Sequence, residues 1–257
     1  MEKIFFITDL DRTIIHSKHR GYKCVEKLDD REITYMSDYA YEKLQGLLKR
    51  EEFIFIPCTM RNITQTLRVD FIRSYNPKVI ICTNGAQIYI DGKLDRVWDK
   101  QMKSLFDQNE LNENINYLEK LKEEYKESIG VIEVRNIEDF YITVKCEDSY
   151  EAEKFYNIIN DKFNKNINVL KIEAKIFIIH NRINKVYAVD YIIKMLNIKK
   201  LITSGDTEVD KEFTSRGVAI LPKHSSFKHE KCIITEKSKI HSTEEILDYI
   251  SELLCKK

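Results

Sequence analysis

Two pairs of aspartates in the sequence could hold a metal ion and carry out nucleophilic or acid–base chemistry. Asp9 and Asp11 follow an apolar run that ends at Thr8, and Asp206 and Asp210 follow a second apolar run. Side chains two residues apart in an extended chain face the same way, so the Asp9 and Asp11 carboxylates tend to point together. Several carboxylates in one partly desolvated place repel one another unless a hard cation is present, and oxygen ligands suit Mg²⁺. Taken alone, each pair is also compatible with acidic residues that only cap a turn or a helix.

Two further side chains have the chemistry of phosphate binding. Thr59 follows a third apolar run, Phe53–Pro57, and its hydroxyl can donate to a phosphoryl oxygen. Lys185 is predicted in the first turn of a helix, where a cation opposes the helix dipole and needs an anionic partner or solvent. Each has a structural alternative, an ordinary threonine at a strand end and a solvated lysine. The occurrence of all four segments in one chain favours the functional interpretation.

The segments around these residues predict an α/β fold. Short runs rich in Ile, Val and Phe alternate with amphipathic segments of helix length, which is typical of parallel strands joined by crossover helices. Ser37 is predicted to cap a helix that extends to about Arg50, and another helix is expected over 63–75. In such sheets ligands bind beyond the carboxyl ends of the strands, so the polar residues that follow the strands should gather at one edge.

The middle of the chain changes character. A hairpin with an Asp91-Gly92 turn is expected over 87–98, followed by a helix, two strands, a second helix and two more strands. This order describes a small α+β unit inserted into a larger one. We therefore expect a core domain formed by 1–85 and 181–257, and an inserted domain over 86–180.

Composition limits the classes of function. Lys plus Arg and Asp plus Glu are each 42, so no overall field draws the chain to nucleic acid or to an anionic membrane, and a small soluble partner is expected. The first ten residues match neither a signal peptide nor a membrane span, which predicts a cytoplasmic protein. The six cysteines are scattered and are expected to be reduced thiols, and the close histidine pairs His16/His19 and His224/His229 are interpreted as surface residues.

Together these segments resemble the four ordered motifs of the haloacid dehalogenase superfamily, and the likeness spans the whole chain. The matching residues are Asp9-x-Asp11-x-Thr13, Thr59-x-Arg61, Lys185 and Gly205-Asp206-x-x-x-Asp210. Thr83-Asn84-Gly85-Ala86 and the insertion between the second and third motifs resemble the Cof-like and sucrose-phosphatase-like branch, called type IIB. The resemblance implies a Rossmann-like parallel-sheet core with an inserted α+β cap that selects the substrate.

The resemblance also implies a role for each matched residue. Asp9 would attack phosphorus to form an aspartyl-phosphate, and Asp11 would protonate the leaving oxygen and then activate water. Lys185 would complete the catalytic set by balancing phosphoryl charge. Mg²⁺ would be held by Asp9, the Asp11 carbonyl and Asp206, with Asp210 either as a further ligand or as a support behind the ligands. The residues expected to bind substrate or its phosphate are Thr13, Thr59, Arg61 and Asn84.

Three positions depart from the usual family pattern. Arg12 stands where Gly is common, Val209 replaces an Asn-type residue, and 221–223 lacks a frequent Gly-Asn pair. None removes a group that the mechanism needs directly, although an amide at position 209 would support metal-bound water. In the inserted domain Arg135 and Lys145 could reach an anionic substrate, but charged residues on small exposed sheets are usually solvated.

The expected activity is therefore hydrolysis of a small phosphate monoester, a sugar phosphate or a similar phosphorylated metabolite, with Mg²⁺. Two alternatives remain open from the sequence. A phosphomutase resembling the phosphomannomutases would pass the same phosphoryl group to a sugar hydroxyl, and a non-catalytic module would only bind a phosphorylated ligand. A P-loop nucleotide hydrolase is excluded because the chain has no G-x-x-x-x-G-K-[ST] segment. The oligomeric state is not encoded in these motifs.

Overall fold

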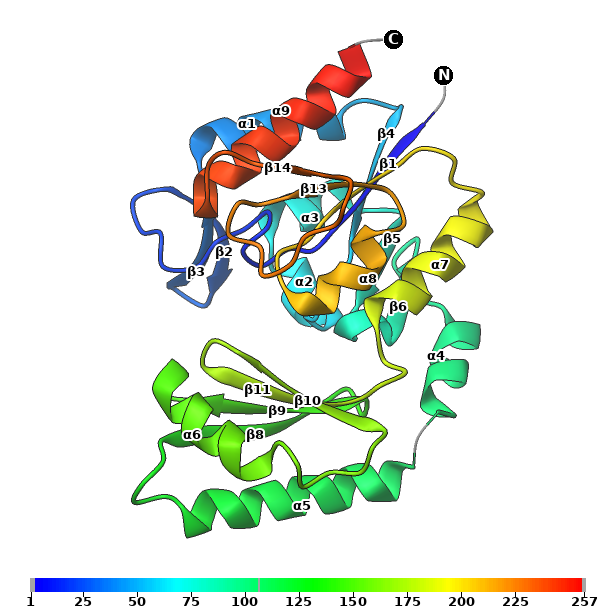
Figure 1. Cartoon of the computed structure of the whole chain (residues 1–257). Helices are drawn as coiled ribbons and strands as arrows, with labels where there is room; N and C mark the ends of the chain where they lie inside the picture. The colour runs from blue at the N-terminus through cyan, green and yellow to red at the C-terminus, as the bar shows by residue number, and fades with distance from the viewer. Residues whose placement is uncertain (1–2, 106, 256–257) are drawn as a thin grey trace. The chain divides into compact units, whose positions relative to one another are not determined.

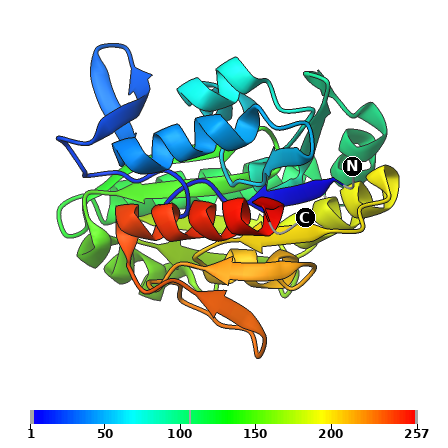
Figure 2. The same cartoon turned by 90° about the horizontal axis from the view of Figure 1, so that it is seen from above.

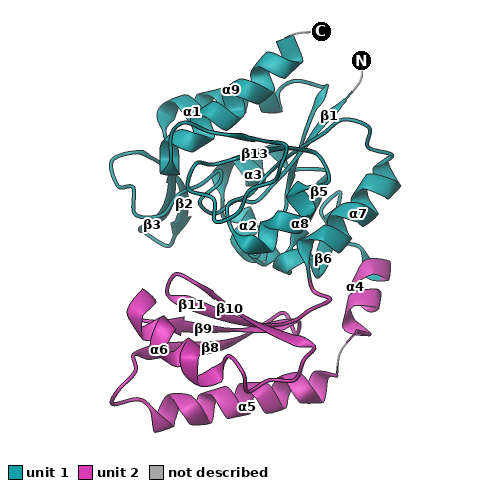
Figure 3. Cartoon of the chain, viewed as in Figure 1, with its two compact units in different colours: residues 1–96, 184–257 teal, residues 97–183 magenta. Residues whose placement is uncertain are grey.

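The computed structural model describes residues 3–105 and 107–255 (Figure 1). The chain forms two compact units, which are coloured separately in Figure 3. Unit 1 consists of Met1–Arg96 and Asn184–Lys257, and unit 2 consists of Val97–Ile183. Unit 2 starts later than the insert expected over 86–180, because residues 87–94 form strands that pair within unit 1.

A five-stranded sheet with the order β14-β13-β12-β1-β4 forms the centre of unit 1. Every pairing in it is parallel, as the alternation of apolar runs and helices predicted. Its strands are β1 (Ile4–Thr8), β4 (Phe53–Pro57), β12 (Leu201–Ser204), β13 (Val218–Leu221) and β14 (Cys232–Ile234). Because β1 lies between β12 and β4, the ends of all three strands meet at one edge.

Helices cover both faces of this sheet. On one face Phe6 and Phe55 pack in a core with buried residues of α1 and α9, which lie side by side (Figure 2). On the other face the Thr203 hydroxyl donates a hydrogen bond of 2.7 Å to the carbonyl of Thr214 in α8. The helices of the unit are α1 (Asp38–Leu48), α2 (Ile63–Leu67), α3 (Asp70–Tyr75), α7 (Lys185–Leu196), α8 (Lys211–Thr214) and α9 (Ser242–Cys255), with short 3-10 turns η1 (Thr83–Gly85), η2 (Glu208–Asp210) and η3 (Lys239–His241).

Local sequence accounts for the helix starts. The Ser37 side chain accepts a hydrogen bond from the Ala40 amide, which confirms the predicted N-cap of α1. The single helix expected over 63–75 is wrong, since Val69 adopts an extended conformation (ψ 122°) and separates α2 from α3. Propensity did not reveal the break because its cause is a tertiary contact: Val69 forms an antiparallel bridge with Glu26.

Two smaller antiparallel sheets complete unit 1. The first is a hairpin of β2 (Lys23–Leu28) and β3 (Arg31–Met36), which sequence analysis did not predict. The second has the order β5-β6-β7, formed by β5 (Val79–Cys82), β6 (Gln87–Ile90) and β7 (Lys93–Leu94). Residues 93–98, expected to be one strand, pair only over Lys93–Leu94, and the helix α4 (Arg96–Lys103) follows.

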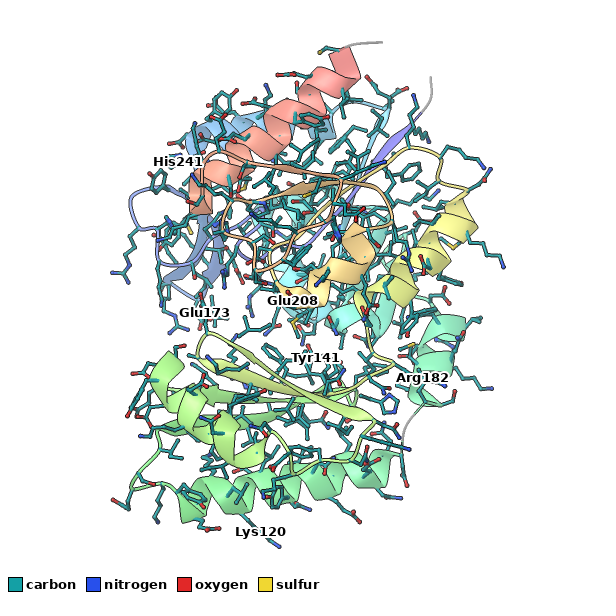
Figure 4. All side chains as sticks on the ribbon, in the orientation of Figure 1. Lys120, Tyr141, Glu173, Arg182, Glu208 and His241 are labelled. Carbon is teal, nitrogen blue, oxygen red and sulfur yellow. The ribbon has the colours of Figure 1, made fainter. Side chains whose placement is uncertain are left out.

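Unit 2 is an antiparallel sheet with the order β10-β11-β9-β8 and two helices on one face. Ile142 and Ile178 of the sheet pack against Leu118 and Phe155 of the helices. Figure 4 shows Lys120 projecting from α5 away from the sheet, whereas Tyr141 lies on the sheet face opposite that helix. Nearly all of α4 belongs to this unit. The elements that follow it are α5 (Gln108–Glu124), β8 (Val131–Ile137), β9 (Tyr141–Cys146), α6 (Ser149–Ile159), β10 (Ile167–Ile172) and β11 (Lys175–His180), in the order that the sequence predicted.

Burial corrects one histidine prediction. His16 is only 3% exposed, so its assignment to the surface is wrong. The Thr243 hydroxyl donates to the Thr13 carbonyl (2.9 Å) and therefore accepts a hydrogen bond from His16 Nε2 (2.9 Å). All six cysteines are free thiols. In the described part of the chain, no helix combines the length and hydrophobicity that crossing a membrane requires.

Candidate active site

The aspartates that follow β1 and β12 are brought together by strand pairing. Thr8 and Ser204 are register partners at the ends of these neighbouring parallel strands. The next amide continues the ladder, since Asp9 N donates a hydrogen bond of 2.9 Å to the Ser204 carbonyl. Asp9 and Asp206 therefore leave adjacent strand ends on the same edge, as expected for ligand-binding residues of an open parallel sheet.

Three buried carboxylates form the centre of the site. Asp9, Asp206 and Asp210 each place an oxygen within 4.8 Å of the oxygens offered by the other two. All three are buried, and within the described residues no group donates a hydrogen bond to Asp206 Oδ2. The Arg12 guanidinium Nε lies 3.0 Å from that oxygen. A set of oxygen donors that includes one buried acceptor with an ion-pair contact but no hydrogen bond fits a hard divalent cation.

The first residue of α7 supplies a buried ammonium to this cluster. Asn184 caps the helix by accepting a hydrogen bond from the Val186 amide, which fixes Lys185 in the first turn. Lys185 Nζ donates hydrogen bonds of 2.6 Å to Asp9 Oδ1 and 2.6 Å to Asp210 Oδ1. Burial by itself lowers the pKa of Lys185, but attraction to the two carboxylates outweighs it and raises the pKa. The two carboxylates therefore favour the charged form of Lys185.

Asp210 is held by backbone hydrogen bonds and by close packing. Its Oδ2 accepts hydrogen bonds from the amides of Asp206 and Thr207, both at 3.0 Å. Gly205 packs directly against it, because a Cβ built on Gly205 would lie 2.4 Å from Asp210 Cβ. The glycine of the Gly205-Asp206 motif is thus required by the close approach of Asp210, whatever its backbone conformation.

Burial also changes the proton affinity of the carboxylates. It is the main cause that raises the pKa of both Asp9 and Asp206, and the surrounding carboxylates add to it. The Lys185 ammonium opposes the rise at Asp9, and the Arg12 guanidinium opposes it at Asp206. Neither cation cancels the rise, so the cluster retains an affinity for positive charge that a divalent ion would satisfy.

The loop after β5 joins the second motif to the start of α7. Asn84 N donates to the Thr59 carbonyl (3.0 Å), and Asn84 itself has a left-handed conformation (φ 55°). Gly85 is also left-handed (φ 87°), and a Cβ on it would lie 2.8 Å from the Asn184 carbonyl oxygen. A residue without a side chain is needed here so that this loop can pack beside Lys185.

Asp11 does not join the carboxylate cluster through its side chain but is paired with Arg61. The guanidinium donates two hydrogen bonds of 2.7 Å, from Nε and a terminal nitrogen, to the two Asp11 oxygens. Its other terminal nitrogen donates to Glu26 Oε2 at 2.8 Å. Glu26 was missed by sequence analysis, since a single glutamate in an unpredicted hairpin carries no motif signal. The donors of Arg61, expected to bind substrate, are thus largely directed at two carboxylates of unit 1.

The turn after β1 carries Thr13, which was expected to bind phosphate, and Arg12, which departs from the usual family pattern. Thr13 is fully buried in the turn after β1, where its amide donates to the Leu10 carbonyl at 3.3 Å. Arg12, in the same turn, has a left-handed conformation (φ 64°), which gives a physical reason why Gly is common at this position in the family. The η2 turn begins after Thr207 and carries Val209, and Glu208 of this turn is labelled in Figure 4.

Comparison with known proteins identifies relatives of this chain. The sequence matches the family described as "Sucrose-6F-phosphate phosphohydrolase" over residues 2–247. Sequence comparison with curated proteins gives no match.

Three solved structures share the fold. A sucrose-phosphatase from Synechocystis sp. PCC6803, in complex with sucrose and phosphate, has 13% identity and a TM-score of 0.63, covering 98% of this chain and 99% of that one. The C-terminal domain of a trehalose-6-phosphate phosphatase from C. albicans has 13% identity and a TM-score of 0.69, covering 98% and 93%. A subclass IIB sugar phosphatase of the haloacid dehalogenase superfamily has 14% identity and a TM-score of 0.61, covering 97% and 99%.

Proposed function

This chain belongs to the sucrose-6F-phosphate phosphohydrolase family, whose members are phosphatases of the haloacid dehalogenase superfamily, and we propose that it hydrolyses a small sugar phosphate or a similar phosphorylated metabolite. The single observation that carries the proposal is the contact of Asp9, Asp210 and Lys185 at the edge of the sheet. The names of the family and of these relatives, a sucrose-phosphatase and a trehalose-6-phosphate phosphatase, support the sugar class.

In the proposed mechanism Asp9 is the nucleophile, Asp11 transfers protons and Lys185 balances charge. A carboxylate oxygen of Asp9 forms a bond to phosphorus as the bond to the leaving oxygen breaks, and Asp11 gives that oxygen its proton. Asp11 then removes a proton from the water that hydrolyses the aspartyl-phosphate. Lys185, fixed 2.6 Å from Asp9, balances the negative charge that gathers around the transferred group.

The remaining residues bind the metal and the phosphoryl oxygens in this proposal. Asp9, Asp206 and Asp210, with the carbonyl of Asp11, would hold Mg²⁺, which when bound supplies positive charge to the phosphoryl oxygens. Thr13, Thr59 and Asn84 are proposed to bind the phosphate. Arg61 was predicted to do the same, but its hydrogen bonds favour a role toward Asp11. Unit 2 is proposed to be the cap that chooses the substrate.

Product analysis with purified protein tests the proposal. With Mg²⁺ and a panel of sugar phosphates, we expect release of inorganic phosphate, and Asp9→Asn should abolish it. Formation of an isomeric sugar phosphate without released phosphate would show a phosphomutase instead. Binding of sugar phosphates with no turnover of any of them, or of an aryl phosphate, would show a non-catalytic module.

A further inference from the structure

Glu26 is a buried charge that the mechanism above does not use. It is 2% exposed and lies on β2, outside every motif of the sequence. A carboxylate is costly to bury unless charged and polar groups satisfy its oxygens. Three side chains do so here, with hydrogen bonds from Arg61 (2.8 Å), Arg68 (3.0 Å) and Thr34 (3.1 Å).

The hairpin is distorted at the point where it presents Glu26. The register of β2 against β3 shifts on both sides of this residue, which is how a bulge redirects a side chain. Glu26 also forms an antiparallel bridge with Val69, the residue that separates α2 from α3. The register shifts in β2 and the bridge to Val69 therefore both help to place the Glu26 carboxylate beside the Arg61 guanidinium.

The Arg61 side chain transmits this placement to Asp11. A guanidinium is planar and rigid, so its donors keep a fixed angle to one another. One edge of Arg61 binds both oxygens of Asp11 at 2.7 Å, while the opposite terminal nitrogen binds Glu26. Fixing that nitrogen on Glu26 sets the plane of the guanidinium, and the plane sets the orientation of the Asp11 carboxyl.

We propose that Glu26 is a positioning residue of the phosphatase reaction, which acts through Arg61 to hold the Asp11 carboxyl in line with the leaving oxygen. The inference rests on the proposed function, in which Asp11 transfers a proton to that oxygen. A misaligned Asp11 slows proton transfer but leaves the attack by Asp9 unchanged. The loss in kcat/KM must therefore grow as the leaving group becomes poorer, because the departure of a poor leaving group depends more on its protonation.

A series of aryl phosphates, from p-nitrophenyl to unsubstituted phenyl phosphate, tests this with Glu26→Gln in the presence of Mg²⁺. We expect kcat/KM for phenyl phosphate to fall at least about tenfold, a part of the 10²–10⁴ that general acid catalysis contributes, with a much smaller fall for p-nitrophenyl phosphate. Partial unfolding of the variant lowers the rates of all substrates by one factor, so it cannot imitate this trend.

Two further variants complete the experiment. Arg61→Lys keeps the positive charge but removes the planar guanidinium that binds Asp11 and Glu26 together. It should show the same dependence on the leaving group even if Glu26→Gln folds poorly. Glu52→Gln is the matched control, because Glu52 also accepts two hydrogen bonds from an arginine, Arg50, in the same unit but away from the site residues. It should leave the whole series unchanged.

The outcomes separate this inference from the proposed function. An active wild type whose Glu26→Gln and Arg61→Lys variants lose the same factor for every substrate, or lose nothing, overturns the positioning role alone. A wild type that hydrolyses no member of the series, and no sugar phosphate, overturns the proposed function and the positioning role with it.

Discussion

Replacing Lys185 by methionine tests whether the ammonium holds the site together. Each of its two contacts is 2.6 Å long, and at an effective dielectric constant of about 20 each represents ~6 kcal/mol of attraction. Desolvation of the ammonium offsets most of this, but its removal takes the paired cation away from Asp9 Oδ1 and Asp210 Oδ1, which stay buried. Breaking a buried pair in this way costs about 3–5 kcal/mol. We expect that loss in the free energy of unfolding, together with loss of phosphatase activity.

Urea unfolding in EDTA, followed by far-ultraviolet circular dichroism, measures the effect. The single tryptophan, Trp98, lies in unit 2, so its fluorescence does not report directly on the unit that carries Lys185. Lys43→Met is the control, since Lys43 pairs with Asp248 at 2.9 Å on the surface and should contribute less than about 1 kcal/mol. A Lys185→Met protein that loses no more than this control would refute the argument.

Three shorter predictions concern the metal, the loop and acid stability. Asp206→Asn should weaken Mg²⁺ binding by about 10-fold or more in calorimetry, because it removes an anionic donor; an unchanged Kd would exclude Asp206 as a ligand. Gly85→Ala should cost about 1–3 kcal/mol more than Gly92→Ala, since both have positive φ but only Gly85 meets backbone, and equal losses would contradict the close packing. Burial, aided by His19 and His224, lowers the pKa of His16 to about 3, so the fold keeps His16 neutral while the unfolded chain binds a proton below pH 6.5. The free energy of unfolding should therefore fall by about 2 kcal/mol between pH 6.5 and 5, and His16→Gln should remove this contribution to the fall. An equally steep fall in the variant would contradict the assignment to His16.

Strand ends and spacing indicated which aspartates would lie together. A parallel strand followed by polar residues has few alternatives, because strands of one sheet share an edge for their carboxyl ends. Asp9, Asp206 and Asp210 could therefore be expected at one edge, whereas Lys185 was indicated by its place in the first turn of a helix and by the family motif. The helix–strand order of unit 2 was also predictable, since amphipathic periodicity is a local property.

Tertiary structure decided what local patterns do not encode. The distorted hairpin that carries Glu26, the break at Val69 and the burial of His16 all depend on which distant surface each residue meets. Arg61 shows the difference most clearly: its motif predicted a ligand for phosphate, whereas its hydrogen bonds join Asp11 to Glu26. The sequence shows which charged residues follow a strand. A long, flexible cation such as Arg61 can reach several anions, and only the packing of the fold decides which of them it contacts.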